Sequence, residues 1–275
     1  MPAAHARAFL RSLAFLAIAL ALVPAYVACF GLGQRARHAV ARLWCRFTCV
    51  ILGVTLRAEG RPFRACPTLY VANHISCIDI LALGTVVDAR FIAKAEVAGW
   101  PLFGQLALLT RTFFVRRRPR FALVQRKALA AQLRTGHSFV LFAEGTSSDG
   151  LAVLPFKTSL LSVAEPWVLD RPVAVQPVTL CYRSHRDGTP VDRGNAGLYA
   201  WYGDGALLPH LWRVLGAPGV VVAIHLGPAT LSWATASRKR LGAELHRMID
   251  QRLELLRLDR EEAVAVDLAA PQHAR

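Results

Sequence analysis

The N-terminal part of the chain contains 23 consecutive residues without a formal charge, from Ser12 to Gln34, most of them Leu, Ala, Val or Phe. As an α-helix this run would be about 34 Å long, enough to cross a hydrocarbon core of ~30 Å. Pro24 lies in its middle and predicts a kink. Arg7 and Arg11 also fit the basic start of a secretory signal peptide, but no clean cleavage site follows. We therefore expect a retained membrane anchor, with a cleaved signal peptide as the alternative.

The segment after this run predicts an amphipathic helix. Its apolar residues share one helical face and its arginines lie opposite, a pattern typical of a helix in the lipid headgroup region. The apolar face consists of Val40, Leu43, Trp44, Phe47 and Ile51, and the opposite face carries Arg35, Arg42 and Arg46. An ordinary helix packed on the following domain is the alternative. If the first helix spans, the arginines after it place the rest of the chain on the cytoplasmic face of the inner membrane.

The formal net charge of the 275-residue chain is +15, and most of it lies in two blocks. Residues 1–72 carry nine arginines against one acid, and residues 111–134 carry eight Arg and Lys residues with no acid. Two such blocks beside an apolar segment indicate an anionic membrane surface or an acidic partner. A nucleic-acid binder is the rival interpretation, but no nucleic-acid-binding motif is visible, so we expect no nucleic-acid partner.

The six cysteines show no CxxC pair and no spacing typical of zinc ligands, and the histidines show no ligand spacing either. We therefore expect no metal site. Four of the cysteines lie in strongly apolar surroundings, which indicates reduced thiols and a cytosolic location for the larger part of the chain.

From about residue 56 onward, short apolar runs alternate with longer mixed segments. Strands are predicted at 68–72, 90–93, 112–115, 138–142, 173–180 and 220–225, and helices at 78–84, 121–135, 159–164 and 237–257. This alternation predicts an α/β domain whose central, largely parallel sheet is flanked by helices, behind an N-terminal hydrophobic anchoring segment. We expect an anchor with its amphipathic helix at 1–55, the main domain at 56–258 and a tail at 259–275.

A histidine and a carboxylate stand close together after the first predicted strand of this domain, at His74 and Asp79. Residues five apart lie 140° apart on a helix, so the two side chains meet only if His74 precedes the helix. We expect Ser76 to be the N-cap and Asp79 the third helical residue. A carboxylate there can fix the tautomer of an imidazole that takes up a proton. A capping box, in which Asp79 only bonds the backbone at Ser76, is the alternative.

A second unusual stretch, Glu144-Gly145-Thr146, follows the apolar run Val140-Leu141-Phe142. Loops at this end of a strand gather the ligand-binding groups of α/β sheets, and glycine allows a close approach of the backbone. A plain turn with a solvated Glu144 is the alternative. The stretch lacks the final glycine of the GxSxG motif and the Gly-Lys-Ser/Thr of a P-loop, so neither site is predicted.

Together, these motifs resemble the glycerolipid acyltransferase family, which includes 1-acylglycerol-3-phosphate acyltransferases. The four blocks that carry the resemblance are Asn73-His74 with Asp79, Thr112–Arg117, Phe142–Ser148 with Leu154–Lys157, and Val173–Pro177. Two positions depart from the family pattern, since Ala143 replaces a proline and Ser147 replaces an arginine. An arginine at this position would suit a phosphate, because it can donate paired hydrogen bonds to the phosphate oxygens. With Ser147 there instead, the stretch resembles that of a bacterial subgroup whose members acylate ornithine-containing lipids.

The resemblance implies transfer of a fatty acyl group to the hydroxyl of a lysolipid, either 1-acylglycerol-3-phosphate or lyso-ornithine lipid. The co-substrate would be acyl carrier protein or coenzyme A carrying the acyl thioester, with no further cofactor. His74 and Asp79 would be catalytic. Glu144, Gly145 and Thr146 would bind the polar part of the acceptor, and Arg117 its charged group. A catalytically silent membrane-binding scaffold of the same fold is the alternative, and an acyl-transfer assay separates the two.

Overall fold

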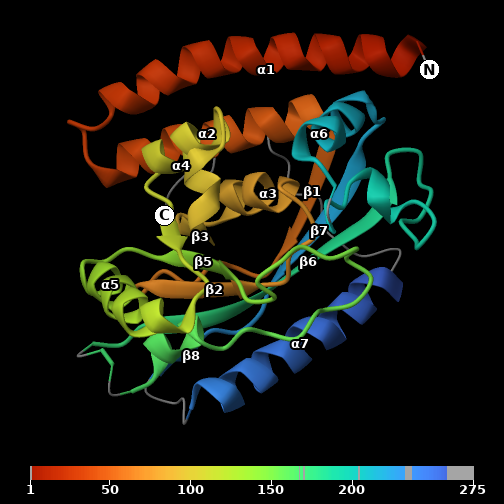
Figure 1. Ribbon diagram of the computed structural model, residues 1–275. Coiled ribbons are helices and arrows are strands. Elements are labelled where there is room, and N and C mark those ends of the chain that lie inside the picture. Colours follow the sequence, from red (N-terminus) through yellow and green to blue (C-terminus); the bar gives the residue numbers. More distant parts are fainter. Residues whose placement is uncertain (1, 167, 170, 204, 233–236, 259–275) are drawn as a thin grey trace.

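The computed structural model describes residues 2–166, 168–169, 171–203, 205–232 and 237–258 (Figure 1). Its centre is an eight-stranded sheet with the order β1-β7-β6-β2-β5-β3-β4, and β8 pairs with β6 outside this path. The strands are β1 Val54–Glu59, β2 Thr68–Ala72, β3 Arg90–Lys94, β4 Phe113–Val115, β5 Phe139–Phe142, β6 Ala174–His185, β7 Val220–Leu226 and β8 Thr230–Leu231. Most pairs are parallel, and β6 runs antiparallel to β7 and β8. The predicted fold class is therefore confirmed.

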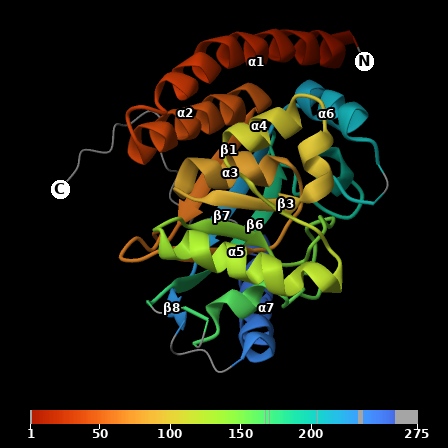
Figure 2. The same cartoon turned by 60° about the vertical axis from the view of Figure 1, so that its left-hand side comes forward.

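Helices cover both faces of this sheet (Figures 1 and 2). They are α1 Pro2–Ala28, α2 Gln34–Leu52, α3 Ile78–Val86, α4 Phe103–Leu109, α5 Ala122–Arg134, α6 Leu207–Gly216 and α7 Arg238–Leu258. In both views α2, α3, α4 and α6 lie on one side of the sheet, and α5 and α7 lie on the other. α1 forms an outer layer over α2 and α6.

The central strand β2 positions the loops that matter for function. All five of its residues are buried, as expected for an apolar strand covered on both faces of a parallel sheet. β2 pairs in parallel with β5 and with β6, so that Ala72 lies opposite Phe142 and Val178. The segment after Ala72 and the segment after Phe142 therefore emerge side by side at one edge of the sheet.

The N-terminal half of α1 is held against the domain by two arginines. The guanidinium of Arg7 donates to the backbone oxygen of Gly216, with Nε 2.9 Å away, and Arg11 donates to Leu215 at 3.0 Å and Ala217 at 2.7 Å. These carbonyls lie at the C-terminal end of α6, where cations are favoured by the helix dipole. The other end of α1 leads directly into α2, which packs on α3. α1 therefore lies along the domain with both ends against it.

Among the described residues, α1 is the helix that is long and apolar enough to cross a membrane, and it continues through Pro24 to Ala28. α2 follows the predicted amphipathic pattern in part. Leu43 and Phe47 are exposed on its outer side, while Arg42 turns inward and pairs with Asp88 of the domain. α2 thus packs on the domain and also has exposed apolar residues on its outer side, and its place in the headgroup region stays a prediction.

Several elements differ from the sequence predictions. The predicted helix at 159–164 is a short 3-10 helix, Leu160–Ala164, whose residues from Leu161 on are buried. Four elements, β1, α4, α6 and β8, were not predicted at all. α4 has seven residues and β8 has two, too short for a periodic pattern to emerge. α6 carries Pro209 near its start, a residue that marks a turn as readily as the first turn of a helix.

Candidate active site

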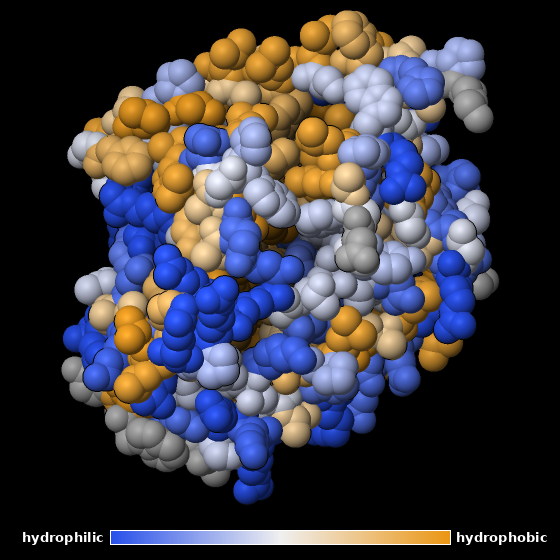
Figure 3. Space-filling view, viewed as in Figure 1, coloured by the Kyte–Doolittle hydropathy of each residue, from blue (hydrophilic) through white to orange (hydrophobic). Residues whose placement is uncertain are grey.

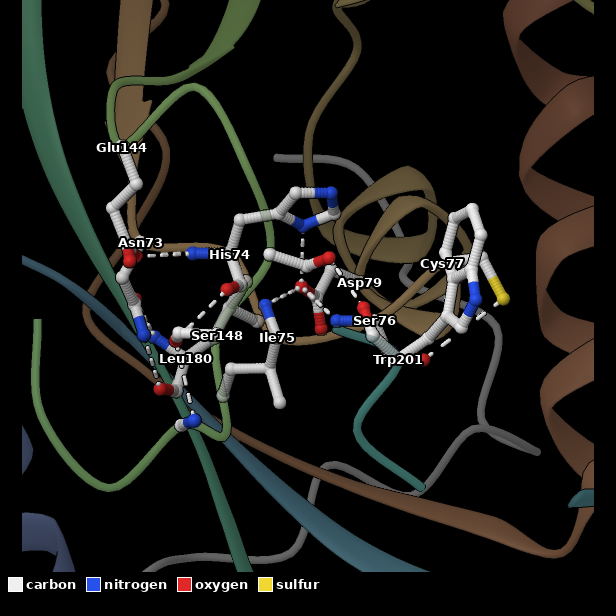
Figure 4. A network of polar contacts seen from close by, with 12 residues as sticks. Asn73, His74, Ile75, Ser76, Cys77, Asp79, Glu144, Ser148, Leu180 and Trp201 are labelled. Carbon is white, nitrogen blue, oxygen red and sulfur yellow. Dashed lines mark hydrogen bonds and ion pairs between the residues drawn. The ribbon is translucent and has the colours of Figure 1, made fainter. Parts of the chain in front are cut away.

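His74 and Asp79 meet in the turn between β2 and α3 (Figure 4). The strand ends at Ala72, the chain turns through His74, and α3 begins at Ile78. Nδ1 of His74 lies 2.8 Å from Oδ2 of Asp79. The helix starts later than expected, because its N-cap is Cys77 rather than Ser76 and Asp79 is its second residue. This shift of one residue leaves the predicted meeting of the two side chains intact.

The carboxylate of Asp79 is fully buried and accepts four hydrogen bonds. Oδ2 accepts from the backbone N–H of Ile75 at 2.6 Å and of Ser76 at 3.0 Å, in addition to the imidazole. Oδ1 accepts from the hydroxyl of Tyr182 at 2.7 Å. Burial, followed by the charge of Asp79, holds the pKa of Tyr182 well above its usual value, so the phenol keeps its proton and donates. Asp79 therefore orients the histidine and bonds the backbone of the turn at the same time.

This arrangement fixes the tautomer of His74. An ionised carboxylate only accepts hydrogen bonds, so Nδ1 carries the proton and Nε2 keeps its lone pair. Figure 4 shows the second ring nitrogen pointing away from Asp79, and His74 lines a large cavity. The ring stacks on Phe142 with the centroids 4.0 Å apart and the planes at 17°. The contacts with Asp79 and Phe142 thus fix the orientation of the imidazole ring, and Nε2 faces the cavity as a proton acceptor.

The loop after β5 holds the backbone of His74. Oε1 of Glu144 accepts from the N–H of His74 at 2.7 Å, and Oε2 accepts from the N–H of Leu154 at 3.1 Å. The N–H of Ser148 donates to the carbonyl of His74 at 2.8 Å. Glu144 is buried and does not line the cavity. Its carboxylate therefore bonds the backbone of the His74 turn, and its contact with the acceptor stays a prediction.

Residues far away in the sequence complete the support. The side chain of Asn73 bonds the backbone of Leu180 on β6 twice, donating at 2.9 Å and accepting at 2.8 Å. The N–H of Trp201 donates to the carbonyl of Ile75 at 3.0 Å, and the hydroxyl of Ser147 donates to the carbonyl of Trp201. Asn73 belongs to one of the sequence motifs, but no role was predicted for it. No local signal in the sequence indicated Tyr182 or Trp201.

The cavity beside His74 has a volume of about 1150 Å³. Its walls are largely apolar and come from α1, α2, α3, α4 and α6, with Phe15, Trp44, Ile78, Leu106 and Leu211 among them. Figure 3 shows hydrophobic residues along the top of this face, over α1, and hydrophilic residues gathered below them. A cavity of this size and lining suits a long apolar chain.

Cationic side chains gather at the catalytic end of the cavity. Gly145 has a φ of +73°, and a Cβ there would lie 3.2 Å from the side chain of Lys157 and 3.7 Å from Arg117. Burial lowers the pKa of Lys94, and the neighbouring charge of Arg117 lowers it further. Gly145 and Thr146 line the cavity together with these three cations. The structure thus brings His74, Asp79, Gly145, Thr146 and Arg117 to one place, suited to a hydroxyl compound with an anionic group.

Within the described part of the chain, no group of three or more His, Cys, Asp or Glu side chains could hold a metal ion.

Comparison with known proteins gives the class of this domain. Residues 56–180, which contain both site loops, match the family model described as Acyltransferase. Two relatives cover most of the chain. It is 36% identical over 260 residues to the lyso-ornithine lipid O-acyltransferase of Brucella abortus, covering 93% of this chain and 97% of that one. It is 38% identical over 247 residues to the enzyme of that name from Rhizobium meliloti, covering 88% and 83%.

Two further proteins, which are less similar in sequence, are also named acyltransferases. The 1-acyl-sn-glycerol-3-phosphate acyltransferase of Neisseria gonorrhoeae is 30% identical over 168 residues, covering 60% of this chain and 62% of that one. The crystal structure of the LPA acyltransferase PlsC from Thermotoga maritima shares the fold, with a TM-score of 0.67 at 20% identity, over 94% of this chain and 100% of that one. The chain belongs to the glycerolipid acyltransferase family, and it is an acyltransferase.

The buried carboxyl of Glu144 predicts a pH dependence of stability. Burial raises its pKa from 4.5 to about 7, against the backbone hydrogen bonds it accepts. The folded chain therefore holds this proton more tightly than the unfolded chain, and the free energy of unfolding falls as pH rises from about 4.5 to about 7. Glu144→Gln cannot titrate and should lose this part of the slope. Unfolding measured across this pH range in both proteins checks the prediction, and equal slopes would contradict it.

Proposed function

We propose that this chain transfers a fatty acyl group from an acyl thioester to the free hydroxyl of lyso-ornithine lipid. The observation that carries the proposal is the imidazole of His74, oriented by Asp79 and facing a large apolar cavity. The relatives at 36–38% identity are named for this acceptor, which supports the choice over 1-acylglycerol-3-phosphate.

The chemistry follows from the orientation of the ring. The acceptor hydroxyl gives its proton to Nε2 of His74 while its oxygen attacks the thioester carbonyl carbon. The carbon–sulfur bond then breaks, and the leaving thiolate takes the proton from the imidazolium. Asp79 stabilises the transient positive charge on the ring. The acyl group passes directly to the acceptor, so this route needs no acyl-enzyme.

The cations near Gly145 supply a place for the charged part of the acceptor. Arg117 can donate two parallel hydrogen bonds to a carboxylate or a phosphate, and Lys94 and Lys157 lie beside it. Ser147 stands where the family pattern has arginine, and its hydroxyl donates to the carbonyl of Trp201. One guanidinium fewer favours a carboxylate, the anionic group of an ornithine lipid, over a doubly charged phosphate monoester.

The donor in this proposal is acyl carrier protein, with coenzyme A as the alternative. Arg116 and Arg118 line the cavity next to Arg117, and Arg120 is exposed just beyond them. This arginine block lies between β4 and α5, and α5 lies on the far side of the sheet from α1 (Figure 1). A soluble acidic protein can reach it while the apolar surface remains in a membrane.

The same arrangement supports attachment to the cytoplasmic face of the inner membrane by an in-plane helix. Phe9, Leu13, Leu16 and Leu20 of α1 are each about half or more exposed, although they are strongly apolar. Because Arg7 and Arg11 fix the start of α1 to α6, these side chains enter the membrane with α1 lying along its surface rather than crossing it.

An acyl-transfer assay tests the proposed reaction. The purified full chain is offered lyso-ornithine lipid and lysophosphatidate side by side, each with acyl carrier protein or coenzyme A as thioester carrier. We expect preferential acylation of lyso-ornithine lipid from the carrier protein. His74→Ala should lose ~10²–10⁴-fold in rate while staying folded, because a general base contributes about that much. His5→Ala, the same change outside the cavity, should keep the rate.

Each other outcome removes one part of the proposal. A preference for lysophosphatidate would overturn the acceptor, and a preference for coenzyme A would overturn the donor. Near-normal turnover of His74→Ala would remove the general base. No transfer to either acceptor would favour the silent scaffold.

The in-plane attachment predicts a topology. Epitope tags at the two ends of the chain should both be cut by protease added to inside-out inner-membrane vesicles, because neither end crosses the bilayer. Right-side-out vesicles serve as the control, and both tags should survive there. Protection of the N-terminal tag alone in the inside-out vesicles would show that α1 spans the membrane.

A further inference from the structure

A second group of cationic side chains lies at the other end of the large cavity, where α1 turns into α2. This α1–α2 cationic cluster consists of Arg37 and His38 on α2, Arg90 at the start of β3, Arg111 just after α4, and His137 just before β5. All but His137 line the cavity. β3 runs from Arg90 to Lys94, so the cluster lies about 13 Å from the catalytic cations, measured along that strand. The acyl-transfer chemistry makes no use of it.

The cluster is held together by direct contacts between segments distant in sequence. The guanidinium of Arg37 lies 4.9 Å from the centroid of the Phe30 ring, and that of Arg111 lies 5.2 Å from the same centroid. Arg90 donates to the side-chain oxygen of Gln132 at 2.9 Å and lies 3.0 Å from Nε2 of His137. These contacts fix the positions of the arginines but neutralise none of their charge.

The backbone also places positive charge here. Arg111 has a φ of +57°, a left-handed conformation that is unfavourable for a residue with a side chain. α2 begins at Gln34 without a capping side chain and without an acid in its first turn. The N-terminus of a helix is positive and favours anions, yet this one carries Arg37 and His38.

No acid balances these charges within the residues that the structure describes. No carboxylate lies at ion-pair distance from Arg37, Arg90 or Arg111 there. The nearest acid, Asp88, acts on His38 but is already paired with Arg42 and lies 3.9 Å from Arg64. Burial and then the charge of Arg111 lower the pKa of Arg90, and burial and then the charge of Arg90 lower the pKa of His137 to about 4. This end of the cavity therefore gathers positive charge that, among the described residues, no carboxylate at ion-pair distance offsets.

We propose that the α1–α2 cationic cluster binds the phosphate of an anionic phospholipid headgroup. Guanidinium groups from two segments can each give paired hydrogen bonds to phosphate oxygens, and the first N–H groups of α2 add donors. A lipid is favoured over a free anion by the side chains around the cluster. Val27, Leu32 and Leu108 are apolar and more than half exposed, and Leu32 is 74% exposed. The bound lipid ties the α1–α2 turn to β3.

The test uses thermal unfolding of the full chain in a neutral detergent, where no charged membrane surface contributes. Three additives are compared, namely phosphatidylglycerol, phosphatidylcholine and inorganic phosphate. At saturating concentration, phosphatidylglycerol should raise the Tm by ~5–10 °C, because a ligand that binds only the folded state stabilises it. Phosphatidylcholine and inorganic phosphate should leave the Tm nearly unchanged.

Two matched variants separate a built site from general charge. Arg37→Gln should lose most of the shift caused by phosphatidylglycerol. Arg35→Gln removes the same charge from an exposed position on the same helical turn and should keep the shift. Without lipid, Arg37→Gln should unfold no earlier than the wild type, since it relieves repulsion, whereas a merely structural arginine would lower the Tm. If Arg37→Gln does not fold, Arg37→Lys, which keeps the charge but not the paired donors, should lose part of the shift.

Equal shifts in the wild type, Arg35→Gln and Arg37→Gln would overturn the site. An equal shift with inorganic phosphate alone would overturn the lipid as its ligand. Neither outcome bears on acyl transfer, which the cluster does not serve.

Discussion

The buried carboxylate of Asp79 is the group on which the rest of the site depends. A buried charge is tolerated only when its oxygens are fully hydrogen-bonded. Here the donors come from three places, namely the turn after β2, the imidazole of His74 and the hydroxyl of Tyr182 on β6. The same acid that orients the imidazole of His74 therefore ties a turn, a helix and a strand together. Oδ2 has three donors, whereas Oδ1 has the hydroxyl of Tyr182, so loss of that hydroxyl would leave Oδ1 buried without this bond.

A second set of contacts supports His74 from the other side. Glu144 and Ser148, both from the loop after β5, hold its N–H and its carbonyl, and Phe142 lies flat against its ring. This is possible because β2 and β5 are parallel neighbours and end at the same edge of the sheet. The two sequence motifs therefore form one structural unit, in which residues of the second motif hold the histidine of the first in place.

The sequence predicted well those features that local patterns determine. Buried strands such as β2 appear as continuous apolar runs, and the His74–Asp79 meeting follows from helical geometry and a turn. The N-cap was misplaced by one residue because Ser76 and Cys77 both precede an apolar helix. The backbone contacts of Glu144 were not predicted for a different reason, since a carboxylate after a strand looks the same in sequence whether it faces a ligand or the backbone. Tyr182 and Trp201 bond Asp79 and Ile75, which lie more than 100 residues away in the sequence. Such contacts leave no periodic pattern in the local sequence, so they could not be predicted from it.

The tautomer of His74 tests the central claim most directly. Nitrogen-15 chemical shifts of histidine-labelled protein, assigned by the signals that disappear in His74→Ala, show which ring nitrogen carries the proton in the neutral form. The contact with Asp79 predicts a protonated Nδ1 and an unprotonated Nε2. A neutral ring with its proton on Nε2 would have no free acceptor toward the cavity and would contradict the account.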